Sequence, residues 1–183
     1  LLGAKTIKTY NKKKTQANLF STIGKDNGKG IILSGHSDVV PAISSDWTSD
    51  PFIARDSGNK IFGRGTSDMK GFIACTLAVA PLFADEKLSL PIHFSYTFDE
   101  ETGCLGAPLV LSDLQKRNIK ASACIIGEPT NMKAITANKG YNEYITHFSG
   151  LSGHASNPEA GVSAIEYAIE YSNKLLELRN DLK

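Results

Sequence analysis

Residues 63–71 read Gly63-Arg64-Gly65-Thr66-Ser67-Asp68-Met69-Lys70-Gly71, a glycine-rich turn that carries an aspartate close to its end. An apolar, helix-like run follows over residues 69–83. Asp68 therefore stands where a tight turn meets a helix. One interpretation is a helix cap, because a carboxylate accepts hydrogen bonds from the first N–H groups of a helix. The alternative is a metal ligand, and it depends on what the rest of the chain brings to Asp68.

Three apolar runs elsewhere in the chain end abruptly in residues that can bind metals. The runs begin at residues 31, 92 and 124, and they end at His36 and Asp38, at Glu100 and Glu101, and at Glu128. In open α/β sheets, functional sites form beyond the carboxyl ends of the strands. Three strands that deliver such side chains to one edge, with Asp68 beside them, are typical of a metal hydrolase.

The order of the elements predicts an α/β fold with a mostly parallel central sheet. Buried, continuously apolar strands are expected at residues 30–33, 91–98 and 121–126. Helices are expected at residues 69–83, where Pro81 distorts or ends the helix, and at residues 107–117. The apolar positions of the first helix cover most of its faces, which predicts that it is well buried. Residues 15–23 are expected to form an edge strand.

The character of the sequence changes near residue 134, so we assign residues 1–134 to a partial catalytic, metal-binding domain and residues 135–183 to the start of a second one. A strand is expected at residues 141–149, a loop at 150–158 and an amphipathic helix at 162–178. One strand and one helix cannot bury a core alone. The first residue is Leu1, and we expect the chain to be part of a longer protein.

Composition narrows the class of protein. The formal net charge of +1 gives no reason to expect nucleic acid as a partner, and Lys12-Lys13-Lys14 reads as a solvated turn. No apolar stretch approaches membrane-span length, so no membrane partner is expected. The three cysteines, Cys75, Cys104 and Cys124, are widely spaced and form no C-x-x-C pair. They indicate reduced thiols and a cytoplasmic location.

His36, Asp38 and Asp68 have functional and ordinary interpretations. His36 and Asp38 lie two residues apart and point the same way, so Asp38 can orient the ring of a metal-binding His36. The ordinary alternative is a histidine satisfied by a turn carbonyl. Asp68 has two carboxylate oxygens and can bridge two cations. Considered alone, it would be a helix cap.

Glu100 and Glu101 are adjacent at a strand end, so their side chains diverge. One can bind a metal while the other takes the proton of the attacking water, which suits a hydrolase. The ordinary alternatives are a solvated acidic turn for this pair and a surface loop for Glu128. His154 follows Gly153 in a loop that leaves a histidine exposed, so it is a catalytic candidate. His93 and the fourth histidine, residue 147, lie inside apolar runs and are expected to be structural.

Four motifs together resemble the M20 metallopeptidase/deacylase family. In chain order they are Gly35-His36-Ser37-Asp38-Val39-Val40-Pro41, residues 63–71 as quoted above, Asp99-Glu100-Glu101 and Gly127-Glu128-Pro129-Thr130. The set covers nearly the whole chain. The resemblance implies a zinc-hydrolase-type catalytic domain and, for the second domain, the start of a ferredoxin-like α+β lid and dimerisation unit.

The resemblance also implies a metal set. His36 and Glu128 would bind one zinc ion, Asp68 would bridge two, Glu101 would bind the second and Glu100 would be the general base. Two zinc ions per intact subunit are implied, and cobalt is a possible substitute.

Further positions take roles from the same resemblance. Asp38 would orient His36, and His154 would reach into the site of a partner subunit to polarise the scissile carbonyl. The peptide bond between Asp68 and Met69 is expected to be cis. The intact protein would be a homodimer.

Residues 47–52, 99–107 and 127–133 look most like the family members that cleave N2-acetyl-L-ornithine to L-ornithine and acetate in arginine biosynthesis. The expected small-molecule partner is therefore an N-acyl amino acid. Two alternatives stay open: a succinyl-diaminopimelate desuccinylase or other acyl-amino-acid hydrolase of the family, and a non-catalytic metal-binding fragment. The family's second zinc takes a histidine from a C-terminal segment that the 183 residues do not contain.

Overall fold

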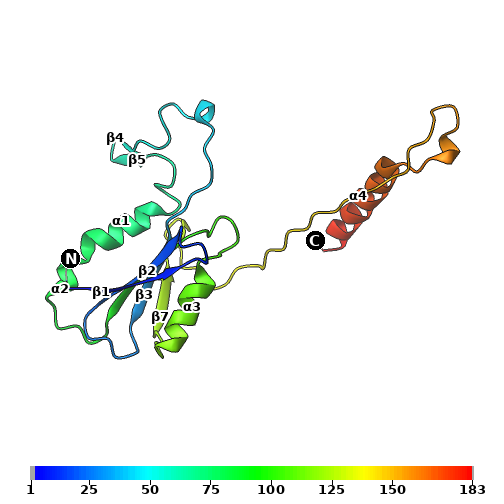
Figure 1. Cartoon of the computed structure of the whole chain (residues 1–183). Coiled ribbons are helices and arrows are strands. Elements are labelled where there is room, and N and C mark those ends of the chain that lie inside the picture. The colour runs from blue at the N-terminus through cyan, green and yellow to red at the C-terminus, as the bar shows by residue number, and fades with distance from the viewer. Residues whose placement is uncertain (1–2, 183) are drawn as a thin grey trace. The chain divides into compact units, whose positions relative to one another are not determined.

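The computed structural model describes residues 3–182 and divides into two compact units, Leu1–Ile135 and Thr136–Lys183. We describe each unit by itself (Figure 1). No helix in the described part of the chain combines the length and the apolar character that a membrane crossing requires.

The first unit is built on a five-stranded mixed sheet with strand order β1-β2-β6-β3-β7. The strands are β1 (Lys5–Tyr10), β2 (Ala17–Ile23), β3 (Ile31–His36), β6 (Ile92–Thr97) and β7 (Ala123–Ile126). β3 pairs in parallel with both β6 and β7, whereas β2 is antiparallel to β1 and to β6. All strands except β2 therefore run in one direction, which confirms the predicted α/β class with a mostly parallel sheet.

Two expectations about individual strands are wrong. β2 is not an edge strand, because β1 pairs with its outer side and β6 with its inner side. β7 is not buried: Ile125 and Ile126 are 52% and 63% exposed. Among residues 3–182, β7 pairs with β3 alone and forms the edge of the sheet, so an apolar run alone does not guarantee cover on both faces.

Helices pack on the sheet of the first unit and bury two separate apolar clusters. The helices are α1 (Lys70–Val79), α2 (Pro81–Ala84) and α3 (Ala107–Lys116). On one side, Val110 and Leu114 of α3 pack with Phe20 and Ile32 of the sheet. The second cluster centres on Ile23, Ala80 and Phe94. Phe20 and Ile23 lie three residues apart in β2, so the two clusters occupy opposite faces.

The helix predicted over residues 69–83 is divided as expected, with Pro81 at the first position of α2. The expectation that it is well buried is wrong, because Thr76 is the one buried residue of α1 in the structure. Leu77 and Val79 are 54% and 42% exposed. The apolar residues of α1 surround the helix, whereas the sheet covers only one of its sides.

A long excursion separates β3 from α1. It contains a 3-10 turn, Ser44–Asp46, and a small hairpin of β4 (Arg55–Ser57) and β5 (Lys60–Phe62). Gly58 and Asn59 both have positive φ at the turn of this hairpin, a backbone shape that asparagine and glycine tolerate. The excursion returns to the sheet through residues 63–69.

The second unit contains a 3-10 turn, Pro158–Ala160, and the helix α4 (Ala164–Asp181), which Ser163 caps by accepting a hydrogen bond from the Glu166 N–H. An isolated bridge joins Leu151 to Val162. The strand expected at residues 141–149 is wrong: this segment is extended but pairs with no strand in the described chain. The ferredoxin-like character of this unit stays a prediction.

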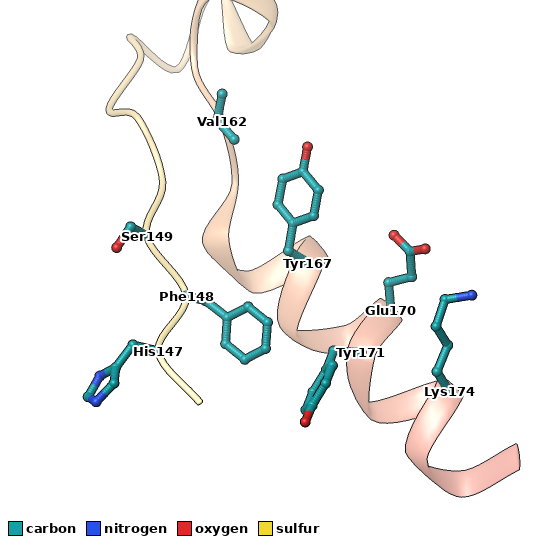
Figure 2. Close-up of a pocket in the computed structure, with 8 residues that line it drawn as sticks. All are labelled: His147, Phe148, Ser149, Val162, Tyr167, Glu170, Tyr171 and Lys174. Atoms are coloured by element: carbon teal, nitrogen blue, oxygen red, sulfur yellow. The ribbon is translucent and has the colours of Figure 1, made fainter. Parts of the chain in front are cut away.

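The extended segment of the second unit runs beside α4. Figure 2 shows the Phe148 ring turned towards Tyr171, and the ring centroids are 5.5 Å apart. A cavity of about 570 Å³ lies here, and His147, Tyr167, Glu170 and Lys174 also line it. None of the candidate metal ligands of the chain lines this cavity.

Candidate metal centre

The sheet brings the candidate ligands together because three parallel strands end at one edge. His36 is the last residue of β3, Glu100 and Glu101 follow β6, and Glu128 follows β7. Register aligns the ends, since His36 pairs with Thr97 in β6 and the Gly127 N–H donates to the Ser34 carbonyl. Asp68 arrives from the turn before α1. The site therefore lies beyond the carboxyl ends of the strands, where α/β sheets place their sites.

His36 is the centre of this cluster. Its Nε2 lies 3.1 Å from Asp68 Oδ1, 3.7 Å from Glu128 Oε1 and 3.9 Å from Glu100 Oε2. The His36 side chain is 2% exposed, whereas those of Asp68 and Glu128 are 52% and 39% exposed. The imidazole is thus fixed in the floor of the site, and the carboxylates remain accessible to water and to a substrate.

Two groups of three residues have ligand atoms within 4.8 Å of one another. One is His36, Asp68 and Glu128, and the other is His36, Glu100 and Glu101. The first is the set that the sequence suggested for one metal ion. The second places Glu101 with His36 and Glu100, so the expected pairing of Glu101 with Asp68 around a second ion stays a prediction.

The electrostatics of the cluster favour a cation. Burial raises the pKa of Glu128, and the neighbouring Asp68 carboxylate raises it further. Burial lowers the pKa of His36, but the Asp68 hydrogen bond, the Asp38 carbonyl and the charges of Glu128 and Glu100 outweigh it, so that the pKa is raised. A divalent ion would offset the repulsion among carboxylates gathered around one imidazole, and one nitrogen with several oxygens suits zinc. The residues therefore fit the implied metal.

Asp38 contacts the His36 ring, as expected, but mainly through its backbone carbonyl. The His36 Nδ1–H donates a hydrogen bond to the backbone carbonyl of Asp38 at 2.9 Å, and Nδ1 lies 3.5 Å from the Asp38 carboxylate. The two carboxylate oxygens instead accept hydrogen bonds from the backbone N–H groups of Glu100 and Glu101, at 3.1 and 3.0 Å. Asp38 thus fixes the ring through its backbone and the Glu100-Glu101 turn through its side chain.

Three further contacts position the cluster, and they were not predicted from the sequence. The backbone N–H of His36 donates to the sulfur of the fully buried Met69 at 3.2 Å. The Cys104 thiol lies 3.6 Å from Glu100 Oε1, and burial followed by the Glu100 charge raises its pKa, so it donates a weak bond. A Cβ on Gly127 would collide with the Phe72 ring, so close packing sets the path towards Glu128. Of these contacts, the one between Cys104 and Glu100 could have been suspected from the sequence, because the two residues are four positions apart.

The Asp68–Met69 peptide bond is cis, which confirms the expectation. The prediction that His93 is structural is also confirmed, because the fully buried ring bonds Thr22 Oγ1 at 2.9 Å and the Lys29 carbonyl at 2.7 Å. His154 belongs to the second unit and to neither ligand group; its Nδ1 lies 2.8 Å from Ser156 Oγ. Its role towards a partner stays a prediction.

Comparison with known proteins gives one consistent result. The profile of peptidase family M20/M25/M40 matches residues 32–178. An acetylornithine deacetylase of Pectobacterium carotovorum is 40% identical over 166 residues, 91% of this chain and 42% of the relative. One from Buchnera aphidicola is 39% identical over 179 residues, 97% of this chain and 46% of the relative. The chain therefore spans less than half the length of these relatives.

A solved structure is similar as well. The M20 family metallo-carboxypeptidase Sso-CP2 of Sulfolobus solfataricus superposes with a TM-score of 0.57 and 25% sequence identity. The superposition covers 68% of this chain and 28% of that one.

Proposed function

The chain belongs to the peptidase family M20/M25/M40, and from that premise we propose that it carries the metal-binding part of a zinc-dependent amidohydrolase that cleaves N2-acetyl-L-ornithine. The observation that carries the proposal is the cluster around His36, whose Nε2 lies within 3.9 Å of carboxylate oxygens of Asp68, Glu128 and Glu100. Three ligands with an open face are the pattern of a catalytic rather than a structural zinc site.

Each residue of the cluster has a proposed task. His36, Asp68 and Glu128 would hold one ion, and Asp68 with Glu101 would contribute to a second. Bound zinc supplies Lewis-acid polarisation of a carbonyl oxygen. Glu100 is the proton acceptor for the attacking water, because its Oε2 lies beside the ligands without being needed in the first set. Asp38 holds the Glu100 backbone, so the acceptor keeps its place.

The choice of substrate is supported by the two relatives described above, which are named acetylornithine deacetylase and are 39–40% identical to this chain over the aligned residues. The products would be L-ornithine and acetate, which places the protein in arginine biosynthesis. A homodimer and a cytoplasmic location belong to the same proposal, as does cobalt as a substitute metal.

A panel of acyl amino acids tests this function in the intact protein. We expect kcat/KM for N2-acetyl-L-ornithine to exceed that for N-succinyl-LL-diaminopimelate by at least about tenfold, since unpaired polar groups penalise the wrong substrate. The reverse order would assign the protein to desuccinylation. If the zinc-loaded protein hydrolyses none of these substrates, a metal-binding role without catalysis remains.

A further inference from the structure

The loop of residues 98–106, here called the acidic loop, carries Glu100 from the end of β6 to the start of α3. Its two ends meet, because the Gly106 N–H donates to the Phe98 carbonyl at 3.1 Å. Asp99, directly before the proposed proton acceptor, has a φ of 52°. Residues other than glycine keep this left-handed backbone only where neighbouring contacts hold it. The place of Glu100 therefore depends on the contacts that hold the acidic loop.

One buried side chain of β2 bridges both ends of the acidic loop. Asn18 is 1% exposed. Its Oδ1 accepts a hydrogen bond from the Phe98 N–H at 3.2 Å, and its Nδ2 donates to the Gly106 carbonyl at 2.9 Å. Nδ2 also donates to Thr9 Oγ1 in β1 at 2.9 Å. A Cβ on Gly106 would lie 2.5 Å from Asn18 Oδ1, so the end of the loop packs directly on this amide.

A second side chain from the same region holds the residue with the left-handed backbone. Gln16 stands directly before β2, and β2 is antiparallel to β6, so the start of β2 lies beside the end of β6. The Gln16 Nε2 donates to Asp99 Oδ1. Its Oε1 accepts a hydrogen bond from Asn11 Nδ2 at 2.9 Å, so the amide of Gln16 is itself held in place. Gln16 thus fixes the residue from which Glu100 follows.

We propose that Asn18 and Gln16 are positioning residues, which hold the acidic loop so that the Glu100 carboxylate keeps its place in the metal cluster. Asp38 holds the same loop from the end of β3, through two backbone N–H groups. Because β6 lies between β2 and β3 in the sheet, the loop is fixed from both sides. Neither Asn18 nor Gln16 belongs to a ligand group, so both act through the loop. The proposal rests on the proposed function, which gives Glu100 its task.

Hydrogen exchange on the intact, zinc-loaded protein tests this assignment without requiring turnover. The N–H groups of residues 103–106 are hydrogen-bonded within the acidic loop, so their exchange reports on its opening. Asn18→Leu keeps nearly the same shape but neither donates nor accepts. Gln16→Met alters a half-buried position, and it tests the same loop if Asn18→Leu does not fold. We expect each variant to speed this exchange at least about fivefold, the factor that one lost hydrogen bond supplies. Unchanged exchange in both variants would overturn the proposal.

Kinetics of the intact protein at saturating zinc separate positioning from stability. Thr9→Val is the matched control, because it removes the third partner of Asn18 and leaves both loop contacts. We expect kcat to fall at least about tenfold in Asn18→Leu and in Gln16→Met, since a shift of about 1 Å in a catalytic group can cost about 10²-fold. KM should stay within about twofold, and Thr9→Val should retain kcat.

Gln16→Glu should lower kcat further than Gln16→Met, because it turns a second carboxylate towards Asp99. Equal losses of kcat in all variants, Thr9→Val included, would make Asn18 and Gln16 merely structural. Unchanged kcat in a variant with a loosened loop would also overturn the proposal. Faster loop exchange in a protein that hydrolyses nothing would support the positioning of the loop and reject the function.

Discussion

At the residue scale, a single buried imidazole defines the centre. The Asp38 carbonyl holds the His36 ring at Nδ1, the Met69 sulfur accepts the His36 backbone N–H, and Nε2 faces the surrounding carboxylates. The carboxylates are more exposed than the histidine, so one of them can take a proton while others bind the metal beside the same histidine. Substitutions at this scale should therefore separate metal binding from chemistry.

Glu100→Gln removes the proposed proton acceptor and preserves the shape of the side chain. In the intact protein we expect the bound zinc to remain and kcat to fall by at least about 10²-fold, the usual contribution of general base catalysis. Metal content by atomic absorption and initial rates measure the two effects. Glu86→Gln, an exposed glutamate outside the cluster, is the control. Loss of metal from Glu100→Gln would make Glu100 a ligand, and unchanged kcat would remove it from catalysis.

Metal binding by the chain should depend on pH. The pKa values of His36 and Glu128 are raised in the metal-free protein, and a metal binds only their deprotonated forms. As the pH falls through the raised pKa of His36, the ring becomes protonated. Zinc must then displace this proton in order to bind, so the zinc affinity falls. Glu128 adds to this dependence at lower pH.

Calorimetry in buffers of different ionisation enthalpy measures the protons released by zinc. We expect the number to increase from alkaline towards mildly acidic pH. A zinc affinity that is flat across this range would show that His36 is not a ligand. His154→Ala should leave the profile unchanged, because His154 belongs to neither ligand group.

At the scale of elements, the ends of β3, β6 and β7 carry the site, and this much follows from sequence. Each apolar run that ends in a potential ligand is a local pattern, and parallel strands gather such ends at one edge. Strand positions were harder to predict: β2 is interior and β7 lies at the edge because of pairing between distant segments. The contacts of Asp38 with the Glu100-Glu101 turn likewise join residues that are 62 and 63 positions apart.

Gly127→Ala tests whether packing behind β7 sets the position of Glu128. A Cβ there meets the Phe72 ring of α1, so the ring or the backbone must move. Overpacking of this kind costs about 1–3 kcal/mol in the free energy of unfolding. We expect that loss in urea denaturation, together with weaker zinc binding. Gly140→Ala is the matched control, because its Cβ would have no atom within 4 Å. Equal stability of the two variants would contradict the packing.

At the scale of the whole molecule, both ligand groups lie in the unit Leu1–Ile135 and both include His36. Its Nδ1 is engaged by the Asp38 carbonyl, so Nε2 alone remains for a metal. One imidazole nitrogen coordinates one ion. The two groups therefore cannot each hold an ion with three protein ligands at once. With Glu100 assigned as the proton acceptor, a bridging Asp68 and Glu101 are the proposed ligands that remain for a second ion among the described residues.

The chain of 183 residues should accordingly bind about one zinc ion and hydrolyse acetylornithine negligibly. A two-metal site stabilises the developing oxyanion by several kcal/mol, and each loss of about 1.4 kcal/mol lowers the rate tenfold. Zinc titration by calorimetry gives the stoichiometry, and an ornithine-release assay on the same preparation gives the rate. His36→Ala should abolish zinc binding. His93 is not substituted as a control, because its buried ring supports the core. A stoichiometry near two, or turnover equal to that of the intact protein, would show that a ligand for the second ion lies within these residues.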